Sequence, residues 1–345
     1  MLRTLCRQLP SGTFNNILDM GCGVGVLGLT LKKLYPASAL TLSDRDALAL
    51  AFTRLNAGLN RLNPVQTGGY LGFSGLPQKS FDLIVANLPA KAGPPVLRHF
   101  FSTFSTCLRP GGLFIPVIVN TLEELASDAL REIVFKERGP EHTVFCCRPQ
   151  NPADPEELAP YIRGNLALQS CGRSLDLKTV YGLPGFDTLS YETGAMLELV
   201  KRFPPSGRTL VWNPGQGAVP AVLAAGSCVL TLGSRDLLQL EVSARNLSPH
   251  RAERRHLPSP AWLKESFENL VVFPDPEPDA AELLASCCSR LLSPLGRLYL
   301  AADSTRTGRF LRALRPQGAQ RGLRLINSKK IRGIRTVLAC RDERD

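Results

Sequence analysis

The sequence predicts an α/β protein built from two doubly wound, mostly parallel sheets in tandem, the second a degenerate copy of the first. Short apolar runs of strand length alternate with amphipathic runs of helix length. A glycine-rich turn follows the first apolar run, and the pattern of the first half recurs in the second. At 345 residues the chain has room for two domains, each with its own core.

Composition narrows the class of protein before any motif is considered. No apolar run is long enough to span a membrane, and no secretory leader is recognisable, so we expect a soluble, cytoplasmic protein. The ten cysteines include no C-x-x-C pair, and the four histidines lack metal-ligand spacing relative to them. We therefore expect reduced, mostly buried cysteines and no bound metal.

The first strand is expected to end at Asp19, before a turn with glycines at 21, 23 and 25 and a helix over 27–34. Such a turn lets backbone approach a ligand and points helix-end N–H groups at it. The glycines fit two templates. As G-x-G-x-x-G, Gly23 to Gly28 indicate a dinucleotide site, whereas Asp19 to Gly25 also fit D-x-G-x-G-x-G.

The second strand is expected over 39–44, and it ends on an acid, Asp44. In a doubly wound sheet, a carboxylate at this position binds ribose hydroxyls. The alternative is that Asp44 caps the helix that begins near Asp46, and the two roles are compatible. A helix through 55–59 and a Gly-rich segment over 67–73 follow, and that segment contains no acid.

A buried parallel strand over 81–87 leads into a turn, Asn87-Leu88-Pro89, at the edge where ligands bind in open α/β sheets. The remaining elements that we expect in the first half are a helix over 96–107, a turn over 108–113, a strand over 113–119, a helix over 121–135 and a strand over 142–147.

Together, residues 19–25, Asp44, 81–89 and 108–113 resemble class I S-adenosylmethionine-dependent methyltransferases of the "small domain" type. That family includes ribosomal RNA guanine-N2 and release-factor glutamine methyltransferases, and the resemblance covers roughly residues 15–148. It implies a Rossmann-like domain with S-adenosylmethionine as cofactor. It also implies cofactor contacts from Asp19, Gly21, Cys22, Gly23, Gly25, Asp44 and Arg45.

The resemblance assigns catalysis to Asn87, Leu88 and Pro89, which the dinucleotide template leaves unexplained. The Asn87 side-chain oxygen and the Leu88 carbonyl would accept hydrogen bonds from the acceptor nitrogen and align it with the methyl donor. The family motif reads N-P-P-F/Y, and its aromatic ring stacks on a base. Here Ala90 stands at that position, and Tyr70, Phe73 or Phe100 are candidates to supply a ring instead.

The second half repeats the first at a shift of about 190 residues. We expect a catalytic domain over 1–149, a Pro-rich linker over 150–160 and a degenerate copy over 161–345. Aligned by sequence, Asp19 becomes Asn213, Gly25 becomes Val219, Asp44 becomes Ser234 and Asn87 becomes Pro274. These losses predict a second domain without catalysis. Residues 182–194 resemble the family's lead-in before the first strand, which the first copy lacks.

The formal charge of +11 is concentrated near the carboxyl end: residues 305–340 carry ten Lys or Arg and no Asp or Glu. Such a stretch attracts phosphates, and the alternative is a solvated face without a partner. The RNA contacts that we expect are Arg321, Arg324, Lys329, Lys330 and Arg332. We expect a monomer that methylates a nitrogen of RNA, with guanine N2 of ribosomal RNA as the acceptor. A protein glutamine or small-molecule acceptor, and a non-catalytic cofactor- or RNA-binding protein, stay open as alternatives.

Overall fold

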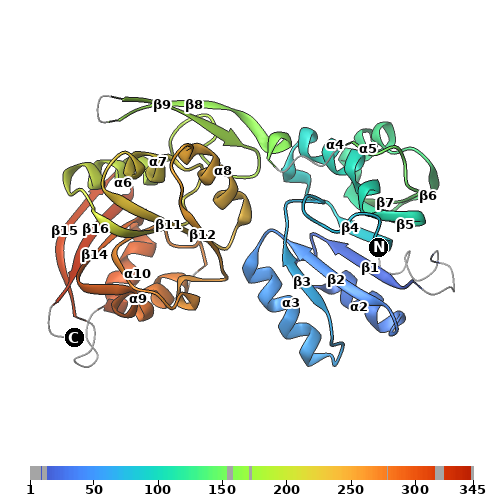
Figure 1. The fold of residues 1–345 in the computed structure, drawn as a ribbon, viewed down its shortest axis with the longest axis horizontal. Coiled ribbons are helices and arrows are strands. Elements are labelled where there is room, and N and C mark those ends of the chain that lie inside the picture. Colours follow the sequence, from blue (N-terminus) through green and yellow to red (C-terminus); the bar gives the residue numbers. More distant parts are fainter. Residues whose placement is uncertain are drawn as a thin grey trace. The chain divides into compact units, whose positions relative to one another are not determined.

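The structure, a computed structural model, describes residues 9, 14–153, 158–170, 173–277, 279–314 and 322–342 (Figure 1). The chain divides into two compact units, Met1–Ile162 and Arg163–Asp345, called here the first and second domains. The domain boundaries drawn from the sequence stay predictions.

The first domain holds a seven-stranded sheet with the strand order β3-β2-β1-β4-β5-β7-β6. Strands β1 to β5 pair in parallel, and β7 runs antiparallel between β5 and β6. The strands are β1 Asn16–Met20, β2 Ala39–Asp44, β3 Gln66–Gly69, β4 Phe81–Asn87, β5 Leu108–Val119, β6 Ile133–Arg138 and β7 His142–Cys147. The helices are α2 Val26–Leu34, α3 Ala47–Leu59, η1 Ala90–Ala92, α4 Pro94–Thr103, η2 Phe104–Thr106, η3 Asn120–Leu122, α5 Glu123–Ala129 and η4 Ala159–Tyr161.

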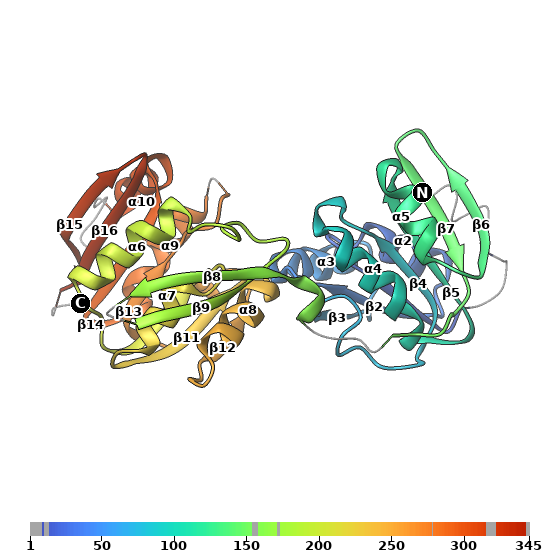
Figure 2. The same cartoon turned by 90° about the horizontal axis from the view of Figure 1, so that it is seen from above.

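The second domain repeats this topology, with the strand order β12-β11-β10-β13-β14-β16-β15. Its strands are β10 Gly207–Trp212, β11 Cys228–Ser234, β12 Glu253–His256, β13 Phe267–Val272, β14 Leu292–Asp303, β15 Leu323–Ile331 and β16 Ile334–Arg341. Its helices are α6 Tyr191–Arg202, α7 Ala218–Ala224, α8 Leu237–Leu247, η5 Pro260–Trp262, α9 Ala280–Leu291 and α10 Ser304–Leu314. A two-stranded hairpin, β8 Ile162–Ser170 and β9 Arg173–Val180, precedes this sheet in the chain (Figure 2). The tandem α/β fold that the sequence predicts is confirmed.

Local sequence explains the elements that carry the site. Strand β1 is buried on both faces, with Ile17 and Leu18 fully inaccessible, which is why it reads as a continuous apolar run. Gly25 is the N-cap residue of helix α2, and its φ of +88° is a conformation that glycine adopts at little cost. Helix α3 begins at Asp46, whose carboxylate accepts a hydrogen bond from Leu48 N at 2.8 Å.

The predicted helix over 121–135 is wrong beyond its first half. Helix α5 ends at Ala129, Glu132 takes a φ of +46°, and β6 begins at Ile133. The residues Ile133, Val134 and Phe135 favour extended backbone, and Phe135 pairs with Cys146 of β7 at the edge of the sheet. Tertiary pairing at the sheet edge therefore overrides the helical reading of this segment.

The structure also corrects the alignment of the two copies. Gly21 N donates to Ser43 O and Asn213 N donates to Gly233 O, so Asn213 corresponds to Gly21 rather than to Asp19. Helices α2 and α7 begin at Gly25 and Gly217, with φ of +88° and +89°. Loops of different length between the strands make any single shift along the sequence wrong in places.

In the corrected alignment, Asp19 corresponds to Val211 and Gly25 to Gly217. Asp44 corresponds to Ser234, as expected. Strand pairing sets Ala86 beside Met20 and Val272 beside Trp212, so Asn87 corresponds to Phe273 and not to Pro274. The second copy thus keeps the helix-starting glycine and loses both carboxylates and the asparagine.

The start of the expected linker packs against the first domain. Gln150 N donates to Ser105 Oγ at 2.8 Å, and its side-chain amide donates to Phe101 O at 2.8 Å. Ala153 N donates to Ser102 O at 2.9 Å. Residues 154–157 of the same segment lie outside the described residues.

Candidate active site at the carboxyl edge of the first sheet

Three neighbouring strands of the first sheet end in the residues that the sequence singled out. Strand β1 leads into Gly21, β2 ends at Asp44 and β4 ends at Asn87. Because β1 lies between β2 and β4 in parallel register, these ends meet at one edge of the sheet. This edge is where ligands bind in open α/β sheets.

The Asp19 carboxyl is the most unusual group at this edge. Its side chain is fully buried, Oδ2 accepts a hydrogen bond from Gly28 N at 2.7 Å, and Oδ1 has no partner among the described residues. Burial raises the pKa of Asp19 to about 7; the hydrogen bond from Gly28 lowers it and the nearby Asp44 carboxylate raises it. A buried oxygen that lacks a partner in the protein indicates a polar or cationic ligand.

The glycine turn wraps the end of β1 with three positive φ angles: +70° at Gly21, +55° at Gly23 and +88° at Gly25. A Cβ placed on Gly23 would meet no atom within 4 Å, so the backbone there borders open space. Cys22 is buried in the turn, and burial raises the pKa of its thiol, so it serves as a small apolar residue rather than a nucleophile.

Asp44 ties the turn to β2. Its Oδ2 accepts a hydrogen bond from Gly23 N at 2.8 Å, and its Oδ1 accepts one from Asp46 N at 2.9 Å. The cap of α3 is Asp46, so the capping role considered for Asp44 belongs to its neighbour. Arg45, between them, is half-buried. Each Asp44 oxygen keeps a second lone pair, which leaves the carboxylate able to accept hydroxyl hydrogen bonds.

Sequence reasoning missed two residues of α3 that brace the turn. Thr53 Oγ1 donates to Gly23 O at 2.8 Å, and Asn56 Nδ2 donates to Val24 O at 2.9 Å. The second copy has polar residues at the matching positions, and these could have indicated the role: Ser243 and Asn246 donate to the carbonyls of Gly215 and Gln216. A polar pair kept at matched positions of two copies indicates a shared structural task.

The Asn87 turn lies beside the glycine turn: a Cβ on Gly21 would stand 4.0 Å from Asn87 O. Asn87 is exposed and its side chain has no hydrogen-bond partner among the described residues. Leu88 is buried and its N–H donates to Val117 O at 2.9 Å, which fixes the turn on β5. Pro89 is exposed, and its carbonyl accepts from the N–H of Ala92, the last residue of η1.

Of the three candidate rings, two belong to the core. Phe73 and Phe100 are 1% and 5% exposed, and their rings meet edge to face at 6.3 Å between centroids. Tyr70 is half-buried, and its N–H donates to Asp44 O at 3.3 Å. The backbone of Tyr70 makes this contact, whereas its ring lies against Gly68, where an added Cβ would stand 2.5 Å from Tyr70 Cε2.

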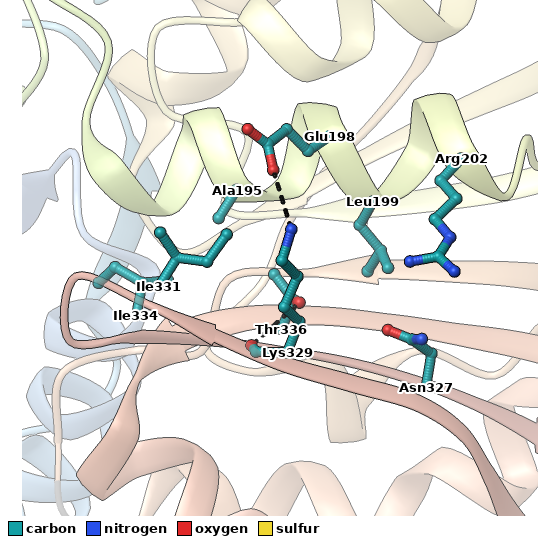
Figure 3. A pocket seen from close by; sticks show the side chains of 9 residues that line it. All are labelled: Ala195, Glu198, Leu199, Arg202, Asn327, Lys329, Ile331, Ile334 and Thr336. Atoms are coloured by element: carbon teal, nitrogen blue, oxygen red, sulfur yellow. Dashed lines mark hydrogen bonds and ion pairs between the residues drawn. The ribbon is translucent and has the colours of Figure 1, made fainter.

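The predicted RNA contacts lie on the β15–β16 hairpin at the edge of the second sheet, except Arg321, which falls outside the described residues. Arg324, Lys329, Lys330 and Arg332 are exposed. Lys329 points toward helix α6, where its Nζ lies 4.0 Å from a Glu198 oxygen (Figure 3). The Arg332 guanidinium stands over the Tyr191 ring at 5.8 Å from its centroid.

The matching edge of the second sheet is filled by the protein's own side chains. Val211, fully buried, replaces Asp19. Asn213 Nδ2 donates to Asp275 Oδ1 at 3.0 Å, and that oxygen lies 3.6 Å from Arg235 Nε. The two open polar side chains of the first domain, Asp19 and Asn87, are thus replaced by the apolar Val211 and Phe273, and the polar side chains that the second domain has at this edge contact one another. Within the described ranges, no cluster of His, Cys, Asp or Glu suits a metal ion, and no helix is long and apolar enough to cross a membrane.

Comparison with known protein families gives a match within the first domain. Residues 2–139 match the family model of the methyltransferase small domain. The matched segment is similar to this family and covers less than half of the chain. The match contains every cofactor and catalytic position that the sequence predicted. The second copy shares the strand order of the first copy without its polar site.

Two curated relatives match part of this chain. Ribosomal RNA large subunit methyltransferase G of Shewanella amazonensis is 34% identical over 118 residues, which is 32% of this chain and 31% of that protein. Ribosomal RNA small subunit methyltransferase C of Pseudomonas entomophila is 45% identical over 85 residues, 25% of this chain and 24% of that protein. The chain therefore spans about a third or less of the curated relatives that it matches.

One solved structure matches both domains. The 16S rRNA guanine N2 methyltransferase of T. thermophilus, determined with AdoMet and guanosine, superposes with a TM-score of 0.71. The superposition covers 98% of this chain and 91% of that one, at 16% identity. This likeness confirms the tandem Rossmann-like fold.

Proposed function

We propose that this chain is an S-adenosylmethionine-dependent methyltransferase that modifies a nitrogen of RNA, with N2 of a guanine in ribosomal RNA as acceptor. The observation that carries the proposal is the meeting of a buried, partly unpartnered carboxyl, an open glycine turn and an exposed asparagine at one edge of the first sheet. The names of the two relatives, both ribosomal RNA methyltransferases, support the acceptor class.

The residues present fit the cofactor. The unpartnered Asp19 Oδ1 suits a cationic amino group, the open side of Gly23 suits close approach of the donor, and Asp44 retains acceptor capacity for ribose hydroxyls. When bound, the cofactor supplies a methyl group on a positively charged sulfur. Gly21, Cys22, Gly25 and Arg45 complete the set that we assign to its binding.

The chain's own part in transfer is to position and desolvate the acceptor. An exocyclic amine needs little acid–base help when the donor carries the positive charge, so alignment supplies most of the effect. We assign to Asn87 Oδ1 and the Leu88 carbonyl the task of accepting the two amine hydrogens. The Leu88–Val117 hydrogen bond and Pro89 hold that turn in place.

We assign substrate binding to the second domain. Its own site is filled by side chains, and its β15–β16 hairpin carries exposed cations. A cytoplasmic location and a monomeric state stay predictions from the sequence. One observation favours a non-catalytic cofactor- or RNA-binding module instead: position 90, where the family motif has an aromatic residue, is an exposed alanine.

The test separates cofactor binding from transfer. Asn87→Ala should retain the wild-type dissociation constant for S-adenosylmethionine in calorimetry while losing about 10²-fold or more of the methyl transfer to unmodified ribosomal RNA. Asp44→Asn should weaken cofactor binding about tenfold or more, because the carboxylate both shapes the turn and accepts hydrogen bonds. Ser234→Ala, at the matched position of the second domain, is the control and should leave binding unchanged.

Three results would count against the proposal. Absence of cofactor binding by the wild-type chain would remove both the enzymatic and the cofactor-binding alternatives. Normal cofactor binding without transfer to any ribosomal RNA would favour the non-catalytic module or another acceptor. Transfer to a glutamine peptide in place of RNA would identify the protein-acceptor alternative.

A further inference from the structure

Helix α6 and the β15–β16 hairpin enclose a pocket in the second domain, which we call the α6–β15 pocket (Figure 3). Its lining includes Leu199 of α6 and Thr336 of β16, which are both buried. Its rim is exposed and carries Glu198, Arg202 and Lys329. The charged groups of this pocket are thus accessible from solvent.

The cations at the rim are weakly paired. Lys329 Nζ lies 4.0 Å from a Glu198 oxygen, and an exposed pair at this distance contributes little. The Arg202 guanidinium stands 5.2 Å from the centroid of the Phe203 ring and has no carboxylate partner in the described part of the chain. Residues 323–341, which contain the whole hairpin, include no Asp or Glu. The rim therefore keeps positive charge that an anion can use.

The matching hairpin of the first domain, β6–β7, has its cations neutralised. Lys136 Nζ lies 2.5 Å from one oxygen of Glu123, and Arg138 Nη1 lies 3.0 Å from the other. Glu123 belongs to α5, the helix between β5 and β6, whereas α10, between β14 and β15, contains no acid. The fold thus does not need open cations on this hairpin. Their presence in the second copy alone indicates an anionic ligand.

An exposed aromatic ring stands beside the pocket. Tyr191, the first residue of α6, is 65% exposed and lies about one helical turn before Ala195, which lines the pocket. Arg332 follows the lining residue Ile331, and its guanidinium stands 5.8 Å from the centroid of the Tyr191 ring. A ring next to cations is the arrangement that binds unpaired nucleotides, with a base on the ring and phosphates on the cations.

We propose that the α6–β15 pocket and the Tyr191–Arg332 pair bind a single-stranded segment of RNA. Arg202 and Lys329 bind its phosphates, and one of its bases stacks on Tyr191. Helix α6 rises about 16 Å between Tyr191 and Arg202, so the two residues contact different nucleotides. The segment is single-stranded because only an unstacked base can reach a protein ring. This inference rests on the RNA binding proposed for the second domain and adds which form of RNA it takes.

The contribution of the ring is tested with the full chain and a short labelled oligoribonucleotide, used as a single strand and as a duplex with its complement. In fluorescence anisotropy, Tyr191→Ala should weaken single-strand binding about tenfold and leave duplex binding unchanged. Tyr191→Phe keeps the ring and should keep the wild-type affinity. Phe52→Ala is the control, because it removes a ring that is 47% exposed on α3 of the first domain.

The contribution of the rim is tested by its salt dependence. Arg202→Gln should reduce the slope of log affinity against log salt for the single strand by about 0.7, the value for one phosphate contact. Arg245→Gln is the matched control, because Arg202 and Arg245 are both exposed arginines in the last turn of a helix. Its slope should equal that of the wild type. Circular dichroism checks that each variant is folded.

The assignment fails if Tyr191→Ala weakens single-strand and duplex binding equally, or weakens neither. It also fails if each control variant has the same effect as the variant that it matches. Displacement of the RNA by an equal concentration of a polyglutamate peptide would identify an acidic polypeptide as the occupant instead. Methyl transfer to ribosomal RNA is measured in parallel. Transfer with RNA binding that ignores Tyr191 removes only the pocket, whereas Tyr191-dependent binding without transfer removes only the proposed activity.

Discussion

Asp19 combines full burial with an oxygen that has no protein partner among the described residues. Burying a polar atom without a hydrogen-bond partner lowers the stability of a folded protein, so such an atom indicates a functional role. The second copy shows the alternative solution, since Val211 fills the same position without a polar atom. Asp19 therefore lowers the stability of the unliganded first domain and raises its affinity for a cation.

The pH dependence of stability follows from the raised pKa of Asp19. The pKa of Asp19 is about 7 in the folded protein and 3.8 in the unfolded chain. The protonated Asp19 carboxyl therefore contributes fully to the free energy of unfolding below pH 3.8, and this contribution is lost as pH rises through 7. Asp19→Asn should therefore unfold at a higher temperature than the wild type at pH 8, and the difference should vanish at low pH. Thermal unfolding across this range measures it.

The exposed carboxylate Asp128 on α5 offers a matched control: Asp128→Asn should leave the pH profile of the wild type in place. Cofactor affinity should change in the opposite direction, rising toward pH 7 and above as Asp19 ionises. A wild-type unfolding temperature that does not fall between pH 5 and pH 8 would contradict the role given to this carboxyl.

Helix α2 owes its position to the absence of side chains at its start. A Cβ on Gly28 would lie 2.6 Å from Leu42 Cδ2 and 2.9 Å from Asp19 Cβ. The helix therefore approaches β1 and β2 closely enough for Gly28 N to reach the Asp19 carboxylate. This approach couples the packing of one helix to the geometry of the site.

Gly28→Ala should destabilise the first domain by about 1–3 kcal/mol through overpacking and should also weaken cofactor binding, as measured by urea unfolding and calorimetry. Gly194→Ala is the control, because Gly194 lies within α6 with nothing within 4 Å of its added Cβ. There the gain in helix propensity should stabilise by about 0.5–1 kcal/mol. Equal effects of the two substitutions would refute the packing argument.

The strands were predictable where burial dictates composition. Strands β2, β4 and β7 have the bounds that the apolar runs indicate, because both faces of a central strand must be apolar. Strand β6 was missed because an edge strand carries alternating exposed side chains, Lys136 and Arg138 among them, which fit a helix equally well. The bracing residues Thr53 and Asn56 were missed because nothing local marks a side chain that bonds to a distant turn.

The duplication as a whole was visible in the sequence, but its register was not. The copies differ in loop length, so the residue opposite Asp19 became clear only from strand pairing and helix starts. The basic stretch near the carboxyl end was recognised by composition alone; the structure divides it between α10 and the β15–β16 hairpin, where two adjacent antiparallel strands bring Arg324, Lys329 and Lys330 together. Whether RNA binds there stays a prediction.

The salt dependence of RNA affinity tests that hairpin. Replacing Arg324, Lys329 and Lys330 together with Gln should weaken RNA binding and reduce the slope of log affinity against log salt by about two to three, because each neutralised phosphate contributes nearly one to that slope. The control replaces Lys33, Lys79 and Lys264, exposed lysines elsewhere in the chain, with Gln. An unchanged slope in the hairpin variant would remove the hairpin from the RNA-binding surface.

The filled edge of the second sheet has a thermodynamic consequence for the chain. A ligand stabilises only what it binds, by RT ln(1 + [L]/Kd), so on the proposed function saturating cofactor should raise the unfolding free energy of the first domain alone. In the second domain, Val211 replaces the buried carboxyl, and the Asn213, Asp275 and Arg235 side chains contact one another. On the proposed function, the stability of the first domain therefore depends on the concentration of the methyl donor, whereas the stability of the second domain does not.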